Sequence, residues 1–203
     1  MAKYDEYQGF DKLYIAEVTE DTVENYTTGT PEQLAPAGEL SVTSNTETAT
    51  KYYDNVPFLN IVTEGATELS VTCPVLPLEM QAKLTGKVYD STKKVLLDSG
   101  QPMTKYFALM YRLRFTDGSY RYVTRNKVSI TIGDESAKTL DDSTDSNGMT
   151  LNIRSISTTH TFEATKLPSK AVMVDERDGG TDVSTWYTEV ATPDNLQAAS
   201  AGA

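Results

Sequence analysis

Cysteine and histidine are nearly absent from this 203-residue chain, which contains one of each, Cys73 and His160. A single cysteine excludes an internal disulfide and fits an intracellular or redox-neutral history. Cys73 ends an alternating stretch, 69–73, so we predict a buried small hydrophobe rather than a nucleophile. His160 lies between two threonines on another alternating segment, which favours a structural or surface histidine over a catalytic base.

Long apolar runs and catalytic motifs are also missing. The first residues contain no apolar core of a signal peptide, and no stretch approaches the length that spans a bilayer, so we expect a soluble protein that is not exported. The sequence contains no nucleophile elbow, zinc motif or phosphate-binding glycine loop. A calcium loop around Gly148 fails because Arg154 stands where an acidic ligand is required. We therefore predict no enzyme, no cofactor and no catalytic, cofactor-binding or metal-binding residue.

Basic residues are the minority charge, with 18 Lys and Arg against 29 Asp and Glu, for a net charge of -11. This balance disfavours a protein that grips nucleic-acid phosphates, although a surface that repels DNA is compatible with it. The 29 Thr and 12 Tyr residues favour strands, so a mainly β fold is predicted. The length suits a single domain over 12–191, between a flexible N-terminal arm, 1–11, and a loose C-terminal tail, 192–203.

The clearest pattern is an alternating hairpin over 106–132, with its turn at Asp117-Gly118. One face of each strand is apolar and should form the floor of the core. These residues are Phe107, Leu109, Tyr111, Leu113 and Phe115 on the first strand, and Tyr120, Tyr122, Val128, Ile130 and Ile132 on the second.

The positions predicted to point outward from this hairpin are basic, namely Arg112, Arg114, Arg121, Arg125 and Lys127. One interpretation is a solvated sheet face. The other is a basic patch that meets an acidic patch on a partner. The pattern alone does not decide between them.

Two segments have helical spacing. Residues 76–85 begin near Pro77, stop at Gly86 and place Leu76, Met80 and Leu84 toward the sheet. A short C-terminal helix is predicted after Asp182, which would cap it, by the spacing of Val183, Trp186, Tyr187 and Val190.

Two long polar segments interrupt the strands. Residues 44–51 form a polar excursion that ends beside Tyr52, Tyr53 and Phe58. These rings either form a satellite cluster under the loop or form an apolar tip held ready for another subunit. Residues 133–148 are rich in Asp, Ser and Thr and should form a long mobile loop.

Two classes of function fit these features. A non-catalytic β-sandwich binding module, for carbohydrate or protein adhesion, would use an exposed aromatic strip. The rings available are Tyr52, Tyr53, Tyr120, Tyr122 and Trp186. An assembly protein would use sheet edges, complementary charge and loops with aromatic ends to contact its own copies.

Several blocks of sequence also occur together in one family. They include Gly-Phe-Asp-Lys-Leu-Tyr at 9–14, Gly-Thr-Pro at 29–31, Leu-Ala-Pro-Ala at 34–37, Leu-Pro-Leu-Glu-Met-Gln-Ala-Lys-Leu-Thr-Gly at 76–86, Phe-Ala-Leu at 107–109, Gly-Ser-Tyr-Arg-Tyr-Val at 118–123 and the pair Trp186-Tyr187. In this order they resemble the major tail protein, or tail tube protein, family of long, non-contractile-tailed phages (siphophages) of Gram-positive bacteria. The similarity runs over about 9–190.

The resemblance implies a β-sandwich or partial barrel flanked by a helix, whose copies form hexameric rings that stack into the phage tail tube. The implied partners are further copies of the chain, the tape measure protein inside the tube, the tail terminator and distal tail or baseplate proteins at its ends, and double-stranded DNA in transit without sequence-specific binding. The implied location is the virion, after assembly in the host cytoplasm.

An acidic bore would keep such a tube from retaining DNA. Ring-to-ring contacts are expected from 43–58 and from the two termini. Residues expected at contacts between subunits are Tyr52, Tyr53, Phe58, Arg112, Arg114, Arg121, Arg125, Trp186 and Tyr187.

Overall fold

The computed structural model describes residues 4–101, 103–133 and 148–199. Within them the chain is mainly β with one flanking helix, as predicted. The strands of the large sheet are β1 (Tyr7–Asp21), β2 (Tyr26–Thr28), β3 (Glu32–Ala35), β4 (Glu39–Tyr53), β5 (Val56–Cys73), β8 (Phe107–Phe115), β9 (Tyr120–Ile132), β10 (Met149–Ser155) and β13 (Ala171–Asp175). The other elements are the hairpins β6 (Val88–Asp90) with β7 (Val95–Leu97) and β11 (Thr161–Phe162) with β12 (Leu167–Pro168), the helix α1 (Leu78–Thr85) and the 3-10 turn η1 (Glu176–Asp178).

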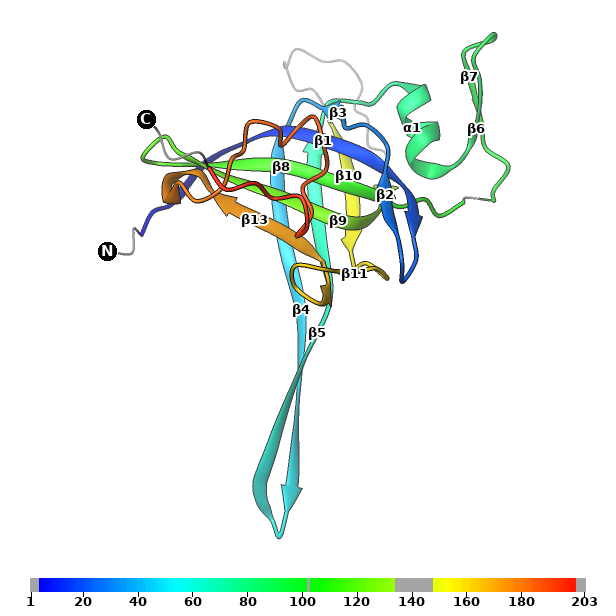
Figure 1. The fold of residues 1–203 in the computed structure, drawn as a ribbon. Coiled ribbons are helices and arrows are strands. Elements are labelled where there is room, and N and C mark those ends of the chain that lie inside the picture. Colours follow the sequence, from blue (N-terminus) through cyan, green and yellow to red (C-terminus); the bar gives the residue numbers. More distant parts are fainter. Residues whose placement is uncertain (1–3, 102, 134–147, 200–203) are drawn as a thin grey trace, which may run out of the picture.

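The large sheet is antiparallel and follows the order β2-β1-β8-β9-β10-β5-β4, while β3 also pairs with β1 and β13 with β9. It is one continuous sheet that bends, so that β1, β8 and β9 run across β4, β5 and β10 (Figure 1). The part that the structure describes does not close into a barrel. The predicted loop 133–148 lies almost entirely outside the described residues.

The predicted hairpin is confirmed as β8 and β9. Its turn places Gly118 at a φ of 88°, and Asp117 Oδ1 accepts a hydrogen bond of 2.8 Å from the backbone N–H of Ser119. Both β8 and β9 lie inside the sheet, since β1 borders one and β10 and β13 border the other.

The prediction of which side chains of β9 face the core is wrong for the first half of the strand. Leu109 pairs with Arg125, but Phe107 pairs with Val128, so β9 contains one extra residue between these pairs. Such a bulge shifts the alternation by one position and moves side chains to the opposite face. Val128 and Ile130 line the principal core as predicted, whereas Tyr122 packs on the other side of the sheet.

Each face of β8 is covered by different residues. The principal core lies inside the bend and is capped by α1; its largest fully buried side chains are Leu13, Ile15, Val71, Leu84, Phe107, Leu109, Tyr111, Val123, Val128, Leu151 and Ile153. The C-terminal segment covers the other face, where Val190 packs with Ala108 and Met110, and Trp186 with Tyr122.

Helix α1 matches its prediction. Leu76 and Leu84 are buried in the principal core, and Met80 packs against it. The helix ends at Gly86, whose φ of 71° favours glycine, and a Cβ there would come within 2.8 Å of Met103. Cys73 is buried as predicted, and burial raises the pKa of its thiol.

The predicted C-terminal helix is absent from the described residues. Residues 184–188 form successive turns instead. Trp186 N–H bonds to Val183 O, and the Thr188 hydroxyl bonds to Thr185 O, so local bonds replace a regular helical ladder. The apolar spacing that suggested a helix instead places Trp186 and Val190 against the sheet.

The described parts of both terminal segments contain more regular contacts than expected. Strand β1 begins at Tyr7, so residues 7–11 of the N-terminal segment expected to be flexible pair with β8. In the expected tail, Asp194 accepts hydrogen bonds from the backbone N–H groups of Glu163 and Ala164, and Thr181 forms a bridge with Ala198. His160 packs edge-on against the Phe162 ring at 4.8 Å, a structural position.

Replacing a buried ring should destabilise the fold far more than replacing an exposed one. Trp186→Ala is expected to lower the free energy of unfolding by about 3–5 kcal/mol, because it leaves a cavity beside Tyr122. Phe58→Ala, at a ring that is 77% exposed, should change it by about 0.5 kcal/mol or less. Denaturant titration checks both values, and equal losses would contradict the assignment of Trp186 to the core.

Asp21 should make stability depend on pH. Burial opposes ionisation of this carboxylate, but Lys127 and the N–H groups of Thr159 and His160 outweigh burial and lower its pKa. The ionised Asp21 carboxylate therefore stabilises the folded state at neutral pH. This contribution is lost as the pH falls below 3.8, the ordinary pKa of the group, toward its lower pKa in the folded state. Asp21→Asn should therefore cost about 1–3 kcal/mol at pH 7.

Denaturant titrations across pH check this. The difference in stability between Asp21→Asn and the unmodified protein should shrink in acid. Asp54→Asn, at an exposed turn, is the matched control for the substitution. A difference that does not change with pH would contradict the role of the Asp21 carboxylate.

Candidate assembly surfaces

Strands β4 and β5 form a hairpin that leaves the body of the molecule. Near the sheet, Leu69 and Val71 of β5 lie in the core, but residues 41–65 of the hairpin are all exposed (Figure 1). The pairing continues outward without interruption of the strands, from Thr46 opposite Glu64 to Tyr53 opposite Val56. The polar segment 44–51, predicted as a loop, is therefore strand, because its backbone groups pair with β5. We call residues 46–63 the arm.

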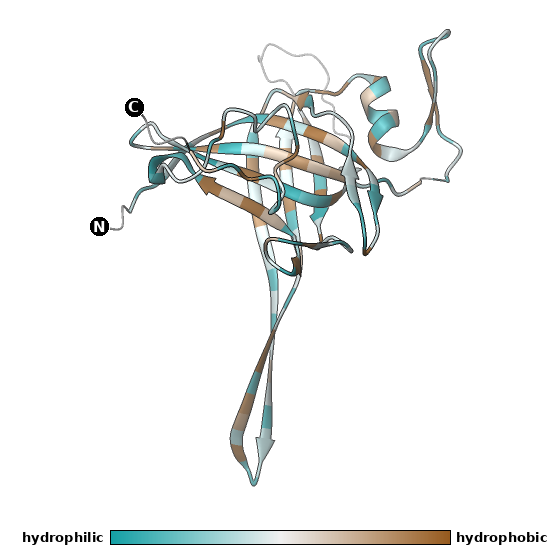
Figure 2. Cartoon of the chain, viewed as in Figure 1, coloured by the Kyte–Doolittle hydropathy of each residue, from teal (hydrophilic) through white to brown (hydrophobic). Residues whose placement is uncertain are grey.

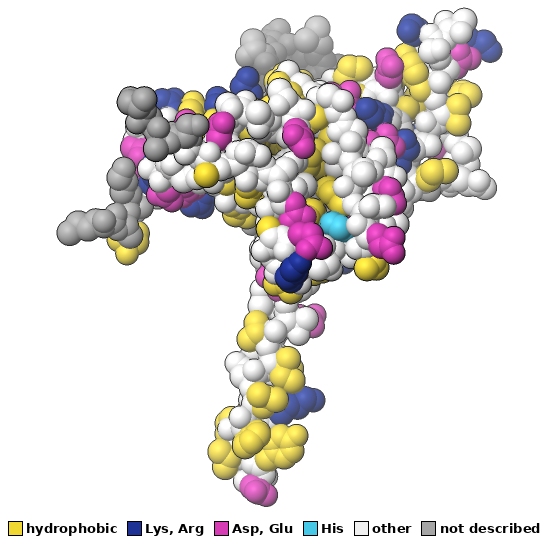
Figure 3. Space-filling model, viewed as in Figure 1, with side chains coloured by type: hydrophobic (Ala, Val, Ile, Leu, Met, Phe, Trp, Pro, Cys, Tyr) yellow, Lys and Arg dark blue, Asp and Glu magenta, His cyan; other side chains and the backbone are white. Residues whose placement is uncertain are grey.

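The end of the arm is apolar. Asp54 and Asn55 form its two-residue turn, both at positive φ, which a tight hairpin turn requires. The Tyr53 and Phe58 rings meet edge to face at 5.3 Å. Figure 3 shows apolar side chains gathered there, and the ribbon of β5 is coloured hydrophobic in the same region of Figure 2. The exposed apolar residues are Tyr52, Tyr53, Val56, Phe58, Leu59, Ile61 and Val62. Of the two alternatives for these rings, the structure favours an apolar tip over a satellite cluster. We call residues 52–59 the arm tip.

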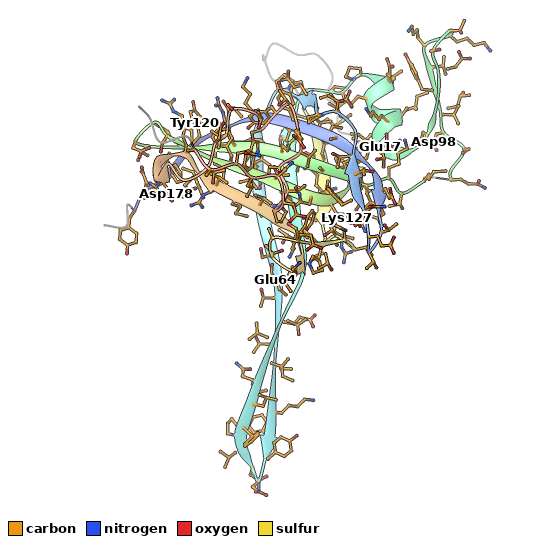
Figure 4. All side chains as sticks on the ribbon, in the orientation of Figure 1. Glu17, Glu64, Asp98, Tyr120, Lys127 and Asp178 are labelled. Carbon is orange, nitrogen blue, oxygen red and sulfur yellow. The ribbon has the colours of Figure 1, made fainter. Side chains whose placement is uncertain are left out.

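The base of the arm is fastened to the body. Lys170 Nζ lies 2.8 Å from Glu64 Oε1 and 2.7 Å from the carbonyl oxygen of Gly65 (Glu64 is labelled in Figure 4). The hydrogen bond from Lys170 lowers the pKa of Glu64. The register of β4 and β5 shifts here, between Ser44 and Thr46. Because a bulge bends a strand, this junction sets the direction of the arm.

The outer edges of the sheet are the second surface. Within the described residues, β4 pairs along one side only, with β5, so its other side presents unpaired backbone groups. At the opposite end of the sheet, β2 and β3 are short strands that pair with β1. An open antiparallel sheet of this kind can be extended by a strand from another chain.

The basic face predicted for the β8–β9 hairpin is divided between two faces. Opposite residues of an antiparallel pair project to the same side, and Arg112 lies opposite Tyr122 whereas Arg121 lies opposite Leu113 and Arg125 opposite Leu109. Arg125 is 7% exposed, so the prediction that it points outward is wrong.

The arginines of this hairpin are also engaged within the chain. Arg112 forms two bonds to Asp11, of 2.6 and 2.9 Å, and stacks over the Tyr120 ring. Arg121 forms two bonds to Asp175, of 2.5 and 2.7 Å, which lower the pKa of that carboxylate. Paired in this way, these arginines hold β1 and β13 against β8 and β9.

Other predicted contact residues lie apart from the arm tip. Trp186 is 3% exposed and Tyr187 is half-buried, so both serve first as packing. Tyr120 and Tyr122 belong to the same cluster as Trp186. The structure therefore does not join the five candidate rings into one exposed strip. Tyr52, Tyr53 and Phe58 are exposed together, and Arg114 is exposed on β8.

A polar depression lies on the sheet face that the C-terminal segment leaves uncovered. Its volume is about 450 Å³, and its polar lining comes from Ser41, Thr43, Glu68, Ser70, Ser129, Thr131, Asn152 and Arg154. This surface was not predicted from the sequence. The feature of the sequence that could have predicted it is the alternation of polar with apolar side chains along β10 and the inner part of β5, where every second residue is buried.

Among the described residues, no group of three or more His, Cys, Asp or Glu side chains is placed to hold a metal ion. None of the described helices is long and apolar enough to cross a membrane.

Comparisons with known proteins give distant likenesses only. No family profile and no curated protein sequence matches the chain. Among solved structures, the tube-terminating cap of the anti-feeding prophage has a TM-score of 0.43 at 10% identity, over 86% of this chain and 95% of that one. The 6-fold symmetrised baseplate of the same particle has a TM-score of 0.37 at 15% identity, over 86% of this chain and 97% of that one. Likenesses of this size carry no inference about function.

The bonds from Lys170 should restrain the arm. Lys170→Met keeps much of the aliphatic length but removes both bonds, so amides near Gly65 should exchange with deuterium severalfold faster. Lys166→Met is the control, because Lys166 lies on the exposed turn between β11 and β12. Equal exchange near Gly65 in all three proteins would contradict the restraint.

Proposed function

We propose that this chain is a structural, non-catalytic subunit of a phage-type tail, which self-associates into hexameric rings that stack into a tube for the passage of DNA. The proposal combines the resemblance of the sequence to tail tube proteins with one observation, the arm. The arm projects from the body and ends in an exposed apolar cluster.

The energetics of the arm support a role in assembly. An isolated two-stranded hairpin is marginally stable in water at best. The arm tip also exposes several large apolar side chains, including Phe58 and Tyr52, and burying each would contribute roughly 1.5–3 kcal/mol. A second copy that covers the arm tip would therefore stabilise both the arm and the contact.

The sheet edges support ring formation. A contact that joins the open side of β4 to the opposite edge of the next copy is head-to-tail, and a head-to-tail contact that closes leaves no unpaired edge. In this proposal the edges join copies within a ring, while the arms join one ring to the next.

The charge of the chain supports a conduit that does not retain DNA. The net charge of -11 opposes phosphate binding, and the arginines Arg112 and Arg121 are already paired with carboxylates. The proposed partners are further copies, a tape measure protein inside the tube, and the terminator and distal tail proteins at its ends. Assembly would take place in the host cytoplasm and the product would be part of the virion.

Electron microscopy with sedimentation tests the proposal. The unmodified protein, concentrated or supplied with a tail-initiation complex, should form rings or tubes. A variant with Tyr52→Ser, Phe58→Ser and Leu59→Ser should lose stacked tubes and leave monomers or single rings, because the arm tip is no longer apolar. Val23→Ser, at an exposed apolar residue outside the arm, should assemble normally.

Two outcomes would contradict the proposal. The first is an unmodified protein that stays monomeric even with the initiation complex. The second is a triple variant that forms tubes of ordinary length.

A further inference from the structure

A second apolar hairpin projects from the molecule. Strands β6 and β7 pair only with each other among the described residues and lie beyond α1 (Figure 1). Val88, Val95 and Leu97 of this hairpin are exposed. Tyr89 and Leu96 of the hairpin are half-buried. A two-stranded hairpin of three-residue strands is weakly stable alone. We call residues 88–97 the receiving hairpin.

The two projecting hairpins differ in charge. Lys93 and Lys94 lie side by side in the turn of the receiving hairpin, and the Lys93 side chain is 78% exposed. The nearest carboxylate to Lys93 is Asp90, at 3.9 Å, and its other oxygen accepts the N–H groups of Thr92 and Lys93. The arm tip, in contrast, ends in the carboxylate of Asp54.

The two hairpins also point in opposite directions. Figure 1 shows the arm extending away from one end of the body and the receiving hairpin away from the other. Neither can reach the other within one chain. Complementary surfaces at opposite ends of a molecule make a contact that repeats from copy to copy, whereas a contact between two arms would end at a dimer and would bring the two Asp54 carboxylates together.

We propose that the arm tip of one copy docks on the receiving hairpin of a second copy. Apolar side chains of the arm tip cover Val88, Val95 and Leu97, and Asp54 lies toward Lys93 and Lys94. This inference rests on the proposed function and deepens it, because it names the surface that receives the arm.

Mixing two defective variants tests the contact. An arm variant, Tyr52→Ser with Phe58→Ser, keeps the receiving hairpin intact. A receiving variant, Val88→Ser with Leu97→Ser, keeps the arm intact. Neither should stack alone. A 1:1 mixture should associate through the one intact contact, as heterodimers of subunits or as pairs of rings that do not stack further, and analytical ultracentrifugation with one labelled variant can measure this. A receiving variant that stacks normally alone would overturn the proposal.

Cysteine cross-linking gives a second measurement that does not require tubes. Cys73 is buried, so Asp54→Cys and Lys94→Cys each supply one exposed thiol. With diamide as the oxidant, the two proteins should form a disulfide with each other at least severalfold faster than Asp54→Cys forms a disulfide with itself or with Val23→Cys. Faster linkage of Asp54→Cys to itself would favour contact between arms and overturn the proposal.

The two experiments separate this inference from the proposed function. Tubes that form without the Asp54–Lys94 linkage would overturn the inference alone. Linkage and heterodimers without rings or tubes would support the contact and refute the tube. Absence of linkage, heterodimers and tubes would overturn both.

Discussion

The pairing of β4 with β5 is the interaction on which the proposed assembly role depends. The same two strands serve two purposes, because their inner portion adds to the sheet and buries Leu69 and Val71. Their outer portion carries the arm tip into solvent with its backbone groups still paired. The hydrogen bonds between the strands thus hold an apolar cluster away from the body, where its side chains are exposed.

The body provides a firm base for this arm. Strands β8 and β9 are covered on both faces, by the principal core on one and by the C-terminal segment on the other. Ion pairs such as Arg112–Asp11 and Arg121–Asp175 fasten neighbouring strands at the surface. Arg112 and Arg121 are engaged inside the chain, whereas Lys93 and Lys94 are exposed, as are Arg114 and Lys51.

Local patterns in the sequence predicted part of this structure. The alternation over 106–132 predicted the central hairpin, the cap at Gly86 predicted where α1 ends, and the environment of Cys73 predicted its burial. The extra residue in β9 could not be predicted, because a bulge depends on pairing with β8 rather than on local alternation. That residue is why Tyr122 faces Trp186 instead of the principal core, and why no single basic face exists.

The candidate assembly surface was only partly predictable for a similar reason. The aromatic residues Tyr52, Tyr53 and Phe58 were identified, but the polar residues before them suggested a loop. Threonine-rich sequence becomes strand when a partner strand is available, and β5 supplies that partner. Helical spacing after Asp182 was misleading because a segment that packs its apolar residues against a sheet can use successive turns.

Amide hydrogen exchange of the arm, before and after assembly, tests the central claim most directly. In the free subunit, the amides of residues 46–63 should exchange quickly, because this two-stranded hairpin has no covering partner among the described residues. In sedimented assemblies the same amides should become strongly protected while those of the body change little. Arm amides that exchange equally fast in both states would contradict the account.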